Sequence, residues 1–397
     1  MLNFTYYTPT EVRFGRGAAD EVAQLVKKYG GKKVLIHYGG GSVVRSGLLD
    51  RVKAALDAGG VAHVELGGVV PNPHLSKVRE GIALCRKEGV DFLLAVGGGS
   101  VIDSTKAIGY GLRMEGDVWD LYRHVKTAEG CMPLGSILTI AAAGSETSNS
   151  SVITREDNGE KRAYNDDISR PRFAIMDPEL TMTLPDYQTA SGCVDILMHT
   201  EERYFSAAGS MELTDAMAEA LMRTVMKNAK ILHDDPKNYD ARAEVMWAGS
   251  LSHNGLTGCG GDGGDWSSHM LEHELGGMFD VAHGAGLAAI WPTWARYVYR
   301  NDVARFKRFA LNVAGVKDEG SDEDIALAGI RAMEDFYRSI AMPTNLKELG
   351  LDPTDEQIAA MARSCAEACG GAKGSIRVLH EEDMKEIYTL AKLGVRR

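Results

Sequence analysis

The sequence predicts an α/β N-terminal domain with a parallel sheet, followed by an all-helical C-terminal domain. Over residues 1–183, short apolar stretches alternate with amphipathic helical stretches. From residue 184 onward, the apolar residues follow only the helical period. Two Gly-Gly-Gly-Ser loops each come directly after an apolar stretch of the first half. Strands that alternate with helices of this length are typical of a parallel sheet covered on both faces.

Five stretches of the first half have the composition of buried strands. Residues 32–38 and 91–96 are apolar runs that lead straight into the two glycine loops. Residues 61–66 alternate between apolar and polar side chains, and residues 134–140 and 173–177 complete the set. The intervening segments have helical periodicity, and two of them end at glycine, at 19–30 and 48–60. This order of elements predicts that the strands form one sheet.

The second half reads as roughly nine helices and no strands. Residues 212–235 form one long amphipathic pattern. Further helical patterns cover residues 241–256, 301–315, 322–341, 355–370 and 380–393. Pro185 lies in the segment 183–188 and suits the first turn of a helix. We therefore expect one domain over residues 1–183 and a second over residues 184–397.

Composition narrows the classes of function. The 397 residues carry a formal net charge of -11 and no basic stripe, which disfavours DNA and RNA as partners. No apolar run approaches the roughly 18 residues that a membrane span needs. The N-terminus lacks the basic and apolar regions of a signal peptide, so we expect a cytoplasmic protein. The six cysteines form no CxxC pair, and we expect all of them to be reduced.

The loop Gly97, Gly98, Gly99 and Ser100 follows a predicted strand and opens a predicted helix. Glycines let backbone amides approach an anion closely, and a helix N-terminus adds partial positive charge. The segment is not the Rossmann pattern, because Ile102 stands at the place of the third glycine. It predicts a phosphate-binding loop of a dinucleotide-binding domain, with a plain tight turn as the alternative.

The second loop consists of Gly39, Gly40, Gly41 and Ser42, again after a predicted strand. In dinucleotide-binding folds an acidic residue at such a strand end holds the adenosine ribose diol. Gly39 occupies that place here, so nothing repels a 2'-phosphate, and Ser42 could bond one. This pattern favours NADP(H) over NAD(H), although the segment could also be a simple loop.

Histidines and carboxylates in the second half have the spacing of metal ligands. Asp195 and His199 are four residues apart, as are His269 and His273, so each pair lies on one side of a helix. His283 follows in a glycine-rich context. Imidazole and carboxylate ligands suit Fe(II), Zn(II) or a related divalent ion. The segment from His269 to His273 also matches the H-x-x-E-H pattern of zinc peptidases called inverzincins.

Seven segments carry a resemblance that covers nearly the whole chain. They are FGRG, PNP, GGGSVIDSTKA, AGSE, DPELTMTLP, GCVDILMHTEERY and HMLEHELGGMFDVAHGAGLA. In this order and spacing they resemble the iron-containing (group III) alcohol dehydrogenases, and most of all the butanol dehydrogenase branch. Members of that branch reduce aldehydes with NAD(P)H. The resemblance implies a short-chain aldehyde or alcohol as substrate, one divalent metal and a homodimer.

The resemblance also implies residue roles. Asp195, His199, His269 and His283 match the family's metal ligands, whereas His273 matches a histidine beside the nicotinamide. Three further residues match cofactor contacts, namely Asp103, Thr139 and Lys161. The chain departs from the family at Ala143, where a threonine often stands, so the resemblance does not carry over one hydroxyl contact near the cofactor.

Three alternatives remain at this stage. In an inverzincin both His269 and His273 would bind zinc and Glu272 would activate water, but this explains neither the glycine loops nor the α/β half. If the chain is instead an alcohol dehydrogenase, Glu272 is expected to point away from the metal, elsewhere on the helix. Glycerol-type dehydrogenases and dehydroquinate synthase share the two-domain architecture. A non-catalytic NAD(P)-binding or metal-binding protein is the alternative of another class.

Overall fold

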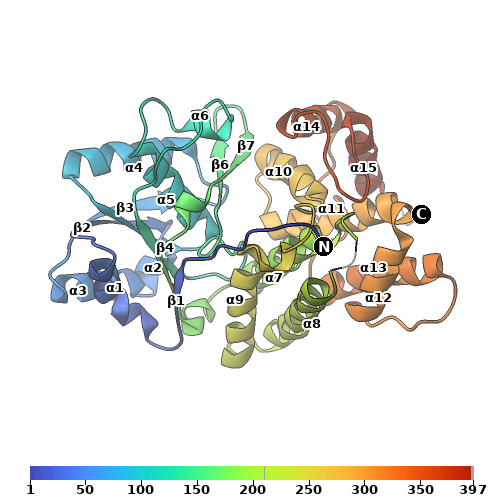
Figure 1. Ribbon diagram of the computed structural model, residues 1–397, viewed down its shortest axis with the longest axis horizontal. Coiled ribbons are helices and arrows are strands. Elements are labelled where there is room, and N and C mark those ends of the chain that lie inside the picture. The colour runs from blue at the N-terminus through green and yellow to red at the C-terminus, as the bar shows by residue number, and fades with distance from the viewer. Residues whose placement is uncertain (210, 395–397) are drawn as a thin grey trace. The chain divides into compact units, whose positions relative to one another are not determined.

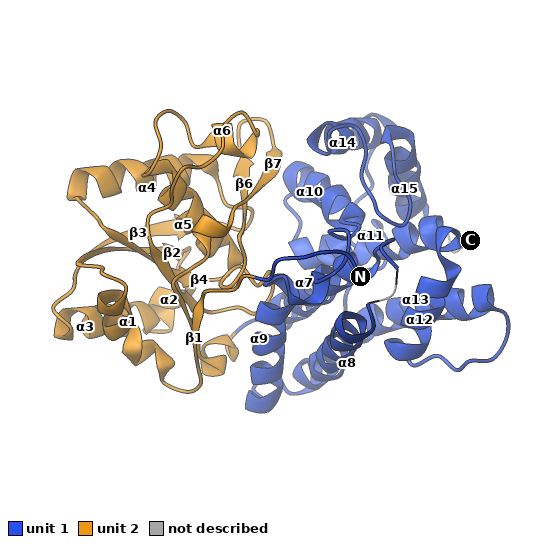
Figure 2. Ribbon diagram, in the orientation of Figure 1, with its two compact units in different colours: residues 1–6, 184–397 blue, residues 7–183 orange. Residues whose placement is uncertain are grey.

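The computed structural model describes residues 1–209 and 211–394, and these form two compact units (Figure 2). One unit comprises residues 7–183, and the other comprises residues 1–6 together with 184–397. The backbone N–H of Leu2 donates a hydrogen bond to the carbonyl oxygen of Gly260 at 2.8 Å. This bond fastens the first residues to the helical unit, whereas the sequence pattern assigns them to the α/β half.

The α/β unit is built on a six-stranded parallel sheet. Its strands, in spatial order, are β1 (Glu11–Phe14), β8 (Phe173–Met176), β5 (Leu134–Leu138), β4 (Phe92–Gly97), β2 (Lys33–Gly39) and β3 (Ala62–Val69). All five neighbouring pairs are parallel. The expected α/β class with a parallel sheet is confirmed. The sequence does not predict the short edge strand β1, because four residues carry too little pattern to stand out.

Helices cover both faces of this sheet (Figure 1). They are α1 (Val22–Lys28), α2 (Ser42–Arg45), α3 (Leu48–Ala58), α4 (Leu75–Glu88), α5 (Gly99–Gly111) and α6 (Trp119–Tyr122). Val34 and Ile36 of β2 belong to the apolar cluster that contains α1 and α3, whereas Leu35 belongs to the cluster that contains α4 and α5. Successive side chains of a strand point to opposite faces, so a strand covered on both sides is apolar throughout.

A two-stranded antiparallel hairpin accompanies the sheet. Its strands are β6 (Ser150–Arg155) and β7 (Glu160–Asn165). The apolar pattern of the sequence does not predict this hairpin, because its strands are polar and partly buried. The dipeptide Asn158-Gly159 lies at the turn and is the available signal, since Asn-Gly favours tight hairpin turns.

The second unit is helical in the described residues, as the sequence predicts (Figure 1). Its helices are α7 (Asp186–Tyr204), α8 (Glu212–Asp234), α9 (Tyr239–His253), α10 (Ser267–Phe279), α11 (His283–Val298), α12 (Val303–Asn312), α13 (Asp322–Ser339), α14 (Asp355–Ala368) and α15 (Glu381–Leu393). Helix α7 is the central one, because it packs against α8, α9 and α11 and is buried over most of its length. Within residues 1–209 and 211–394, no helix is both long and apolar enough to cross a bilayer.

Candidate active site

Helix α7 supplies two of the predicted metal ligands. Asp195 and His199 are one helical turn apart and only 3% and 5% exposed. Nδ1 of His199 lies 3.2 Å from Oδ1 of Asp195 and 3.0 Å from the backbone oxygen of the same residue. The i, i+4 spacing therefore places both side chains on one face of the helix, inside the unit.

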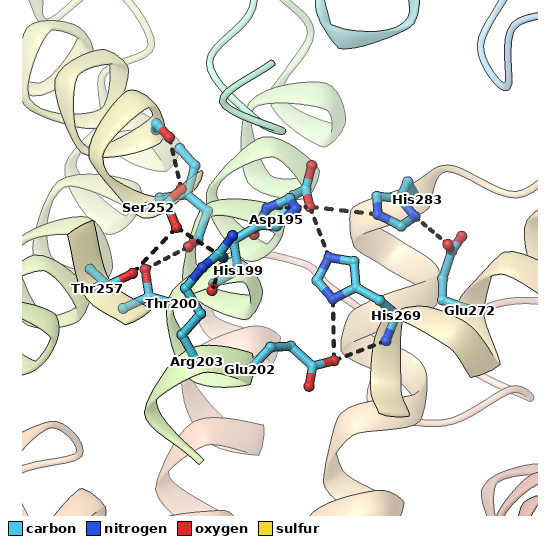
Figure 3. A network of polar contacts seen from close by, with 12 residues as sticks. Asp195, His199, Thr200, Glu202, Arg203, Ser252, Thr257, His269, Glu272 and His283 are labelled. Carbon is cyan, nitrogen blue, oxygen red and sulfur yellow. Dashed lines mark hydrogen bonds and ion pairs between the residues drawn. The ribbon is translucent and has the colours of Figure 1, made fainter. Parts of the chain in front are cut away.

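Helices α10 and α11 bring two further imidazoles to the same carboxylate oxygen (Figure 3). Nε2 of His269 lies 3.8 Å from Oδ1 of Asp195, and Nε2 of His283 lies 3.6 Å from it. Oδ1 of Asp195 and Nε2 of His269 are buried, and neither has a hydrogen-bond partner among the described residues. Such separations are too long for hydrogen bonds but suit two ligands of one ion. The donor set thus fits a divalent metal.

The imidazoles differ in their electrostatics. Burial, followed by the neighbouring His253 and His269, holds the pKa of His199 well below its ordinary value. Burial also lowers the pKa of His269, but the contacts with the carboxylates of Asp195 and Glu202 and their negative charges outweigh it and raise the pKa to about 9. A metal ion binds the deprotonated nitrogen, so it would replace the proton that His269 otherwise holds among these carboxylates.

His273 lies one turn after His269 on α10 and is 7% exposed. Its ring centroid is 5.9 Å from that of His283. Potential ligand atoms form two groups, and within each group they all lie within 4.8 Å of one another. Asp195, His199 and His269 form one group, and Glu272, His273 and His283 form the other. The assignment of His273 outside the ligand set therefore stays a prediction.

The loop between β4 and α5 is tightly packed against its surroundings. A Cβ on Gly97 would lie 2.5 Å from Cγ2 of Val101, and one on Gly98 would lie 2.1 Å from Cγ2 of Ile140. A Cβ on Gly99 would lie 3.1 Å from Cβ of Ala143. Only glycine fits the first two positions, so the backbone at the start of α5, where Ser100 also lies, carries no bulky side chain. Such a helix N-terminus is suited to a phosphate.

The loop between β2 and α2 has more room. A Cβ on Gly39 would lie 3.4 Å from the backbone oxygen of Val69, and one on Gly40 would meet nothing within 4 Å. Gly41 has a φ of +127°, a conformation that favours glycine, and a Cβ there would lie 3.0 Å from Nη1 of Arg45. Ser42 lies at the start of α2, beside Gly41. A guanidinium is thus available beside this loop.

Asp103 and Lys106 hold the segment after β5 against α5. The Asp103 carboxylate accepts hydrogen bonds from Oγ of Ser145 and, at 2.9 Å, from the backbone N–H of Val152. Nζ of Lys106 donates to Oγ of Ser145 at 3.0 Å and to the backbone oxygen of Ser150 at 2.7 Å. Burial lowers the pKa of Lys106 to about 8. Asp103 therefore shapes the segment after β5, and no sequence pattern points to Lys106.

The other two predicted cofactor contacts lie in the same unit. The backbone N–H of Thr139, just after β5, donates to the carbonyl oxygen of Gly97 at 3.1 Å, so Thr139 adjoins the glycine loop. Lys161 lies on β7 opposite Thr154 and is 6% exposed. Their contacts with a cofactor stay predictions.

Comparison with known proteins matches both halves of the chain. Residues 9–178 match the iron-containing alcohol dehydrogenases, and residues 189–392 match the C-terminal part of the Fe-containing alcohol dehydrogenase family. The chain belongs to the iron-containing alcohol dehydrogenase family. It is an NAD(P)-dependent alcohol dehydrogenase, which rules against the zinc peptidase and the non-catalytic binding protein.

Relatives in this family align along almost the full chain. The chain is 40% identical to NADH-dependent butanol dehydrogenase A of Clostridium acetobutylicum, over 98% of this chain and 99% of the relative. It is 38% identical to NADPH-dependent aldehyde reductase YqhD of Escherichia coli, over 89% and 90%. The crystal structure of NADH-dependent butanol dehydrogenase A from Thermotoga maritima superposes with a TM-score of 0.95 at 39% identity, over 98% of this chain and 99% of that one.

Two further rings lie beside this cluster of candidate metal ligands. His253 shows no pairing in the sequence and is not expected there, but its ring centroid lies 4.0 Å from that of His199. The ring centroid of Trp266 lies 6.0 Å from that of His199 and 5.2 Å from that of His269. No spacing rule finds His253, because the end of α9 reaches the site only through helix packing.

Two carboxylates also contact the site without a sequence signal. Glu272 is expected from the sequence to point elsewhere on α10, but its Oε2 contacts Nδ1 of His283 (Figure 3). Glu202 of α7 contacts His269 in a similar way. The expectation for Glu272 is wrong, because α11 begins beside the face of α10 from which Glu272 projects. The spacing of residues within α10 alone cannot reveal this neighbour.

Proposed function

We propose that this alcohol dehydrogenase transfers hydride from NAD(P)H to short-chain aldehydes such as butanal. In the reverse direction it transfers hydride from the alcohols to the oxidised cofactor. The observation that supports it most is the approach of three imidazoles to one carboxylate oxygen, with Nε2 of His283 at 3.6 Å from Oδ1 of Asp195. Relatives named butanol dehydrogenase and aldehyde reductase support this substrate class.

Each half of the chain has one task in this proposal. Residues 1–183 bind the cofactor, with Gly97–Ser100 and the N-terminus of α5 receiving the pyrophosphate. Asp103, Thr139 and Lys161 shape or line the remainder of that site. Residues 184–397 hold the metal and the reacting groups.

Asp195, His199, His269 and His283 would hold one divalent ion, Fe(II) or Zn(II). Such an ion supplies Lewis-acid polarisation of a carbonyl group. The side chains of Asp195, His199 and His269 are 5% to 6% exposed, whereas that of His283 is 27% exposed. Burial keeps water from the first three and strengthens electrostatic interactions there. The solvent-accessible ligand, His283, marks the side from which a substrate can approach.

His273 serves proton delivery or nicotinamide positioning. It lies next to the ligands on α10 without being needed to complete a set of three imidazoles and one carboxylate. An imidazole can hold a proton near neutral pH and pass it to an oxygen that gains negative charge. Water is the alternative route for this proton, and substitution of His273 distinguishes the two.

We propose NADP(H) as the preferred cofactor over NAD(H). The last residue of β2 is Gly39, so no carboxylate stands there to repel a 2'-phosphate. Arg45 provides a positive charge beside Gly41 that could pair with such a phosphate. Relatives carry names with either cofactor, NADH for the butanol dehydrogenases and NADPH for the aldehyde reductase. Cofactor preference must therefore be measured on this chain.

We further propose a cytoplasmic homodimer. Large apolar side chains are exposed along the N-terminal segment, among them Met1 at 69%, Leu2 at 50% and Phe4 at 53%. Contact with a second copy would remove this surface from water, which is favourable. All six cysteines are free, which suits a reducing compartment.

The decisive assay follows the absorbance of reduced nicotinamide. The purified protein is loaded with Fe(II) or Zn(II) and mixed with butanal and NADPH, then with NADH. We expect oxidation of the cofactor that depends on both metal and aldehyde. Absence of turnover with either cofactor and either metal, in a folded protein that binds them, contradicts the proposed reaction.

A further inference from the structure

We propose that Glu202 and Glu272 are positioning residues, each of which orients one histidine of the metal site and sets how tightly the site holds its ion. The inference rests on the proposed function, because it assumes that His269 and His283 bind metal. It assigns the glutamate of the H-x-x-E-H segment to a neighbouring imidazole rather than to activation of water.

Glu202 holds His269 at two points. Its Oε1 accepts a hydrogen bond from the backbone N–H of His269 at 3.0 Å and contacts Nδ1 of the same residue at 3.2 Å. His269 lies in the first turn of α10, where backbone N–H groups lack partners within the helix. One carboxylate from α7 therefore fixes both the start of α10 and the rotation of the imidazole. A proton on Nδ1 leaves Nε2 directed at Asp195.

Glu272 holds His283 from the neighbouring helix. Its Oε2 contacts Nδ1 of His283, the first residue of α11, while Nε2 of His283 faces Asp195 at 3.6 Å (Figure 3). A Cβ on Gly286 would lie 2.8 Å from Cγ of Glu272. The glycine one turn into α11 therefore leaves the space through which Glu272 reaches His283.

Burial explains why these contacts matter energetically. Glu202 and Glu272 are 2% and 0% exposed. A buried carboxylate is costly unless it is paired. Among the described residues, the ion-pair partners of Asp195 and Glu202 are imidazoles. A divalent ion bound through Nε2 of His269 and Nε2 of His283 would compensate the negative charge, and the carboxylates at Nδ1 would in turn strengthen the two imidazoles as ligands.

Glu201 offers a matched control. It precedes Glu202 on α7 and is fully buried. Neither of its carboxylate oxygens has a hydrogen-bond partner among the described residues. A substitution of Glu201 by glutamine thus changes a buried glutamate on the same helix without touching a histidine of the site.

The test measures the affinity of the metal-free protein for Co(II), using the ligand-field absorption of the bound ion and competition with a chelator. We expect Glu202→Gln and Glu272→Gln to weaken Co(II) binding by about 10- to 100-fold, as outer-shell substitutions do. Glu201→Gln should bind Co(II) like the wild type. Circular dichroism of each metal-free variant verifies that it is folded.

Alanine and glycine variants separate positioning from a merely structural role. Glu272→Ala should bind Co(II) more weakly than Glu272→Gln, because the amide oxygen still accepts a hydrogen bond from Nδ1. Gly286→Ala should weaken binding with all ligands intact, since its methyl group displaces Glu272. In the Glu272→Ala background, Gly286→Ala should add little further loss, because the obstructed side chain is gone.

The outcomes distinguish this inference from the proposed function. A wild-type protein that binds no Co(II) would contradict the metal site itself. A wild type that binds Co(II), with Glu202→Gln and Glu272→Gln variants of the same affinity as Glu201→Gln, would overturn the positioning role and leave the metal site standing.

Discussion

One oxygen of Asp195, in the middle of α7, lies 3.6 Å from Nε2 of His283, the first residue of α11. This approach depends on close packing between the two helices. A Cβ on Gly284 would lie 1.9 Å from the backbone oxygen of Ser191, so α11 can begin at this distance from α7 only because residue 284 is glycine.

Replacing Gly284 should therefore separate the ligands as well as destabilise the fold. We expect Gly284→Ala to lose metal and to lower the free energy of unfolding by roughly 1–3 kcal/mol, the usual effect of overpacking. Thermal unfolding and metal analysis measure both effects. Gly40→Ala, where the added Cβ meets nothing within 4 Å, is the stability control. An unchanged metal content in Gly284→Ala would argue against the importance of this packing.

Removing a ligand should separate metal binding from cofactor binding. His199→Ala and His269→Ala are expected to lose both the metal and aldehyde reduction, because each deletes an imidazole of the four-residue set. These variants should still bind NADPH, because the glycine loops belong to the α/β unit. The fluorescence of NADPH measures this binding. A metal-free His269→Ala protein that reduced butanal at the wild-type rate would show that the metal role is wrong.

His273 and His283 should respond differently to substitution. His273→Ala should keep nearly stoichiometric metal but change kcat or its pH dependence, by about 10- to 10⁴-fold if the imidazole is a general acid. His283→Ala should lose the metal. Metal analysis of the two purified variants checks this. An empty site in His273→Ala together with a full site in His283→Ala would reverse the ligand assignment.

Cofactor preference should change at Gly39. Its φ is not in the left-handed region, and a Cβ there would lie 3.4 Å from the nearest atom, so Gly39→Asp is sterically possible. The new carboxylate would repel a 2'-phosphate and accept hydrogen bonds from a ribose diol. We expect kcat/KM to shift from NADPH towards NADH by about tenfold or more, which corresponds to about 1.4 kcal/mol. A wild type that already prefers NADH tenfold contradicts the argument.

Lys106 should make stability depend on pH. Burial lowers its pKa to about 8 in the folded chain, from its ordinary value of 10.5. Between these values the unfolded chain binds the proton more strongly, so the free energy of unfolding should rise with pH, by about 3 kcal/mol at most. Below pH 8 both states are protonated and the cost of burying the charge is constant. Urea unfolding of the wild type and of Lys106→Met at pH 7.5 and pH 10 gives the change in the free energy of unfolding between the two pH values. The same change in both proteins would contradict the prediction.

Sequence periodicity determined the fold class because burial on both faces imposes a local pattern. The apolar runs at 32–38 and 91–96, each followed by a helical stretch, are typical of interior strands, and the structure has β2 and β4 there. The four-residue β1 and the polar hairpin β6–β7 escaped, because edge strands and half-exposed hairpins have no continuous apolar run.

For the site, sequence spacing determined which residues share a helix face, and helix packing decided which of them meet. The four-residue spacing of Asp195 and His199 requires no other element, since both lie on one turn of α7. The position of His283 beside Asp195, of His253 beside His199 and of Glu202 beside His269 depends on how α7, α9, α10 and α11 pack together. Contacts between helices far apart in the chain are set by side-chain volumes, such as the absence of a Cβ at Gly284, and those volumes act only once the helices are packed.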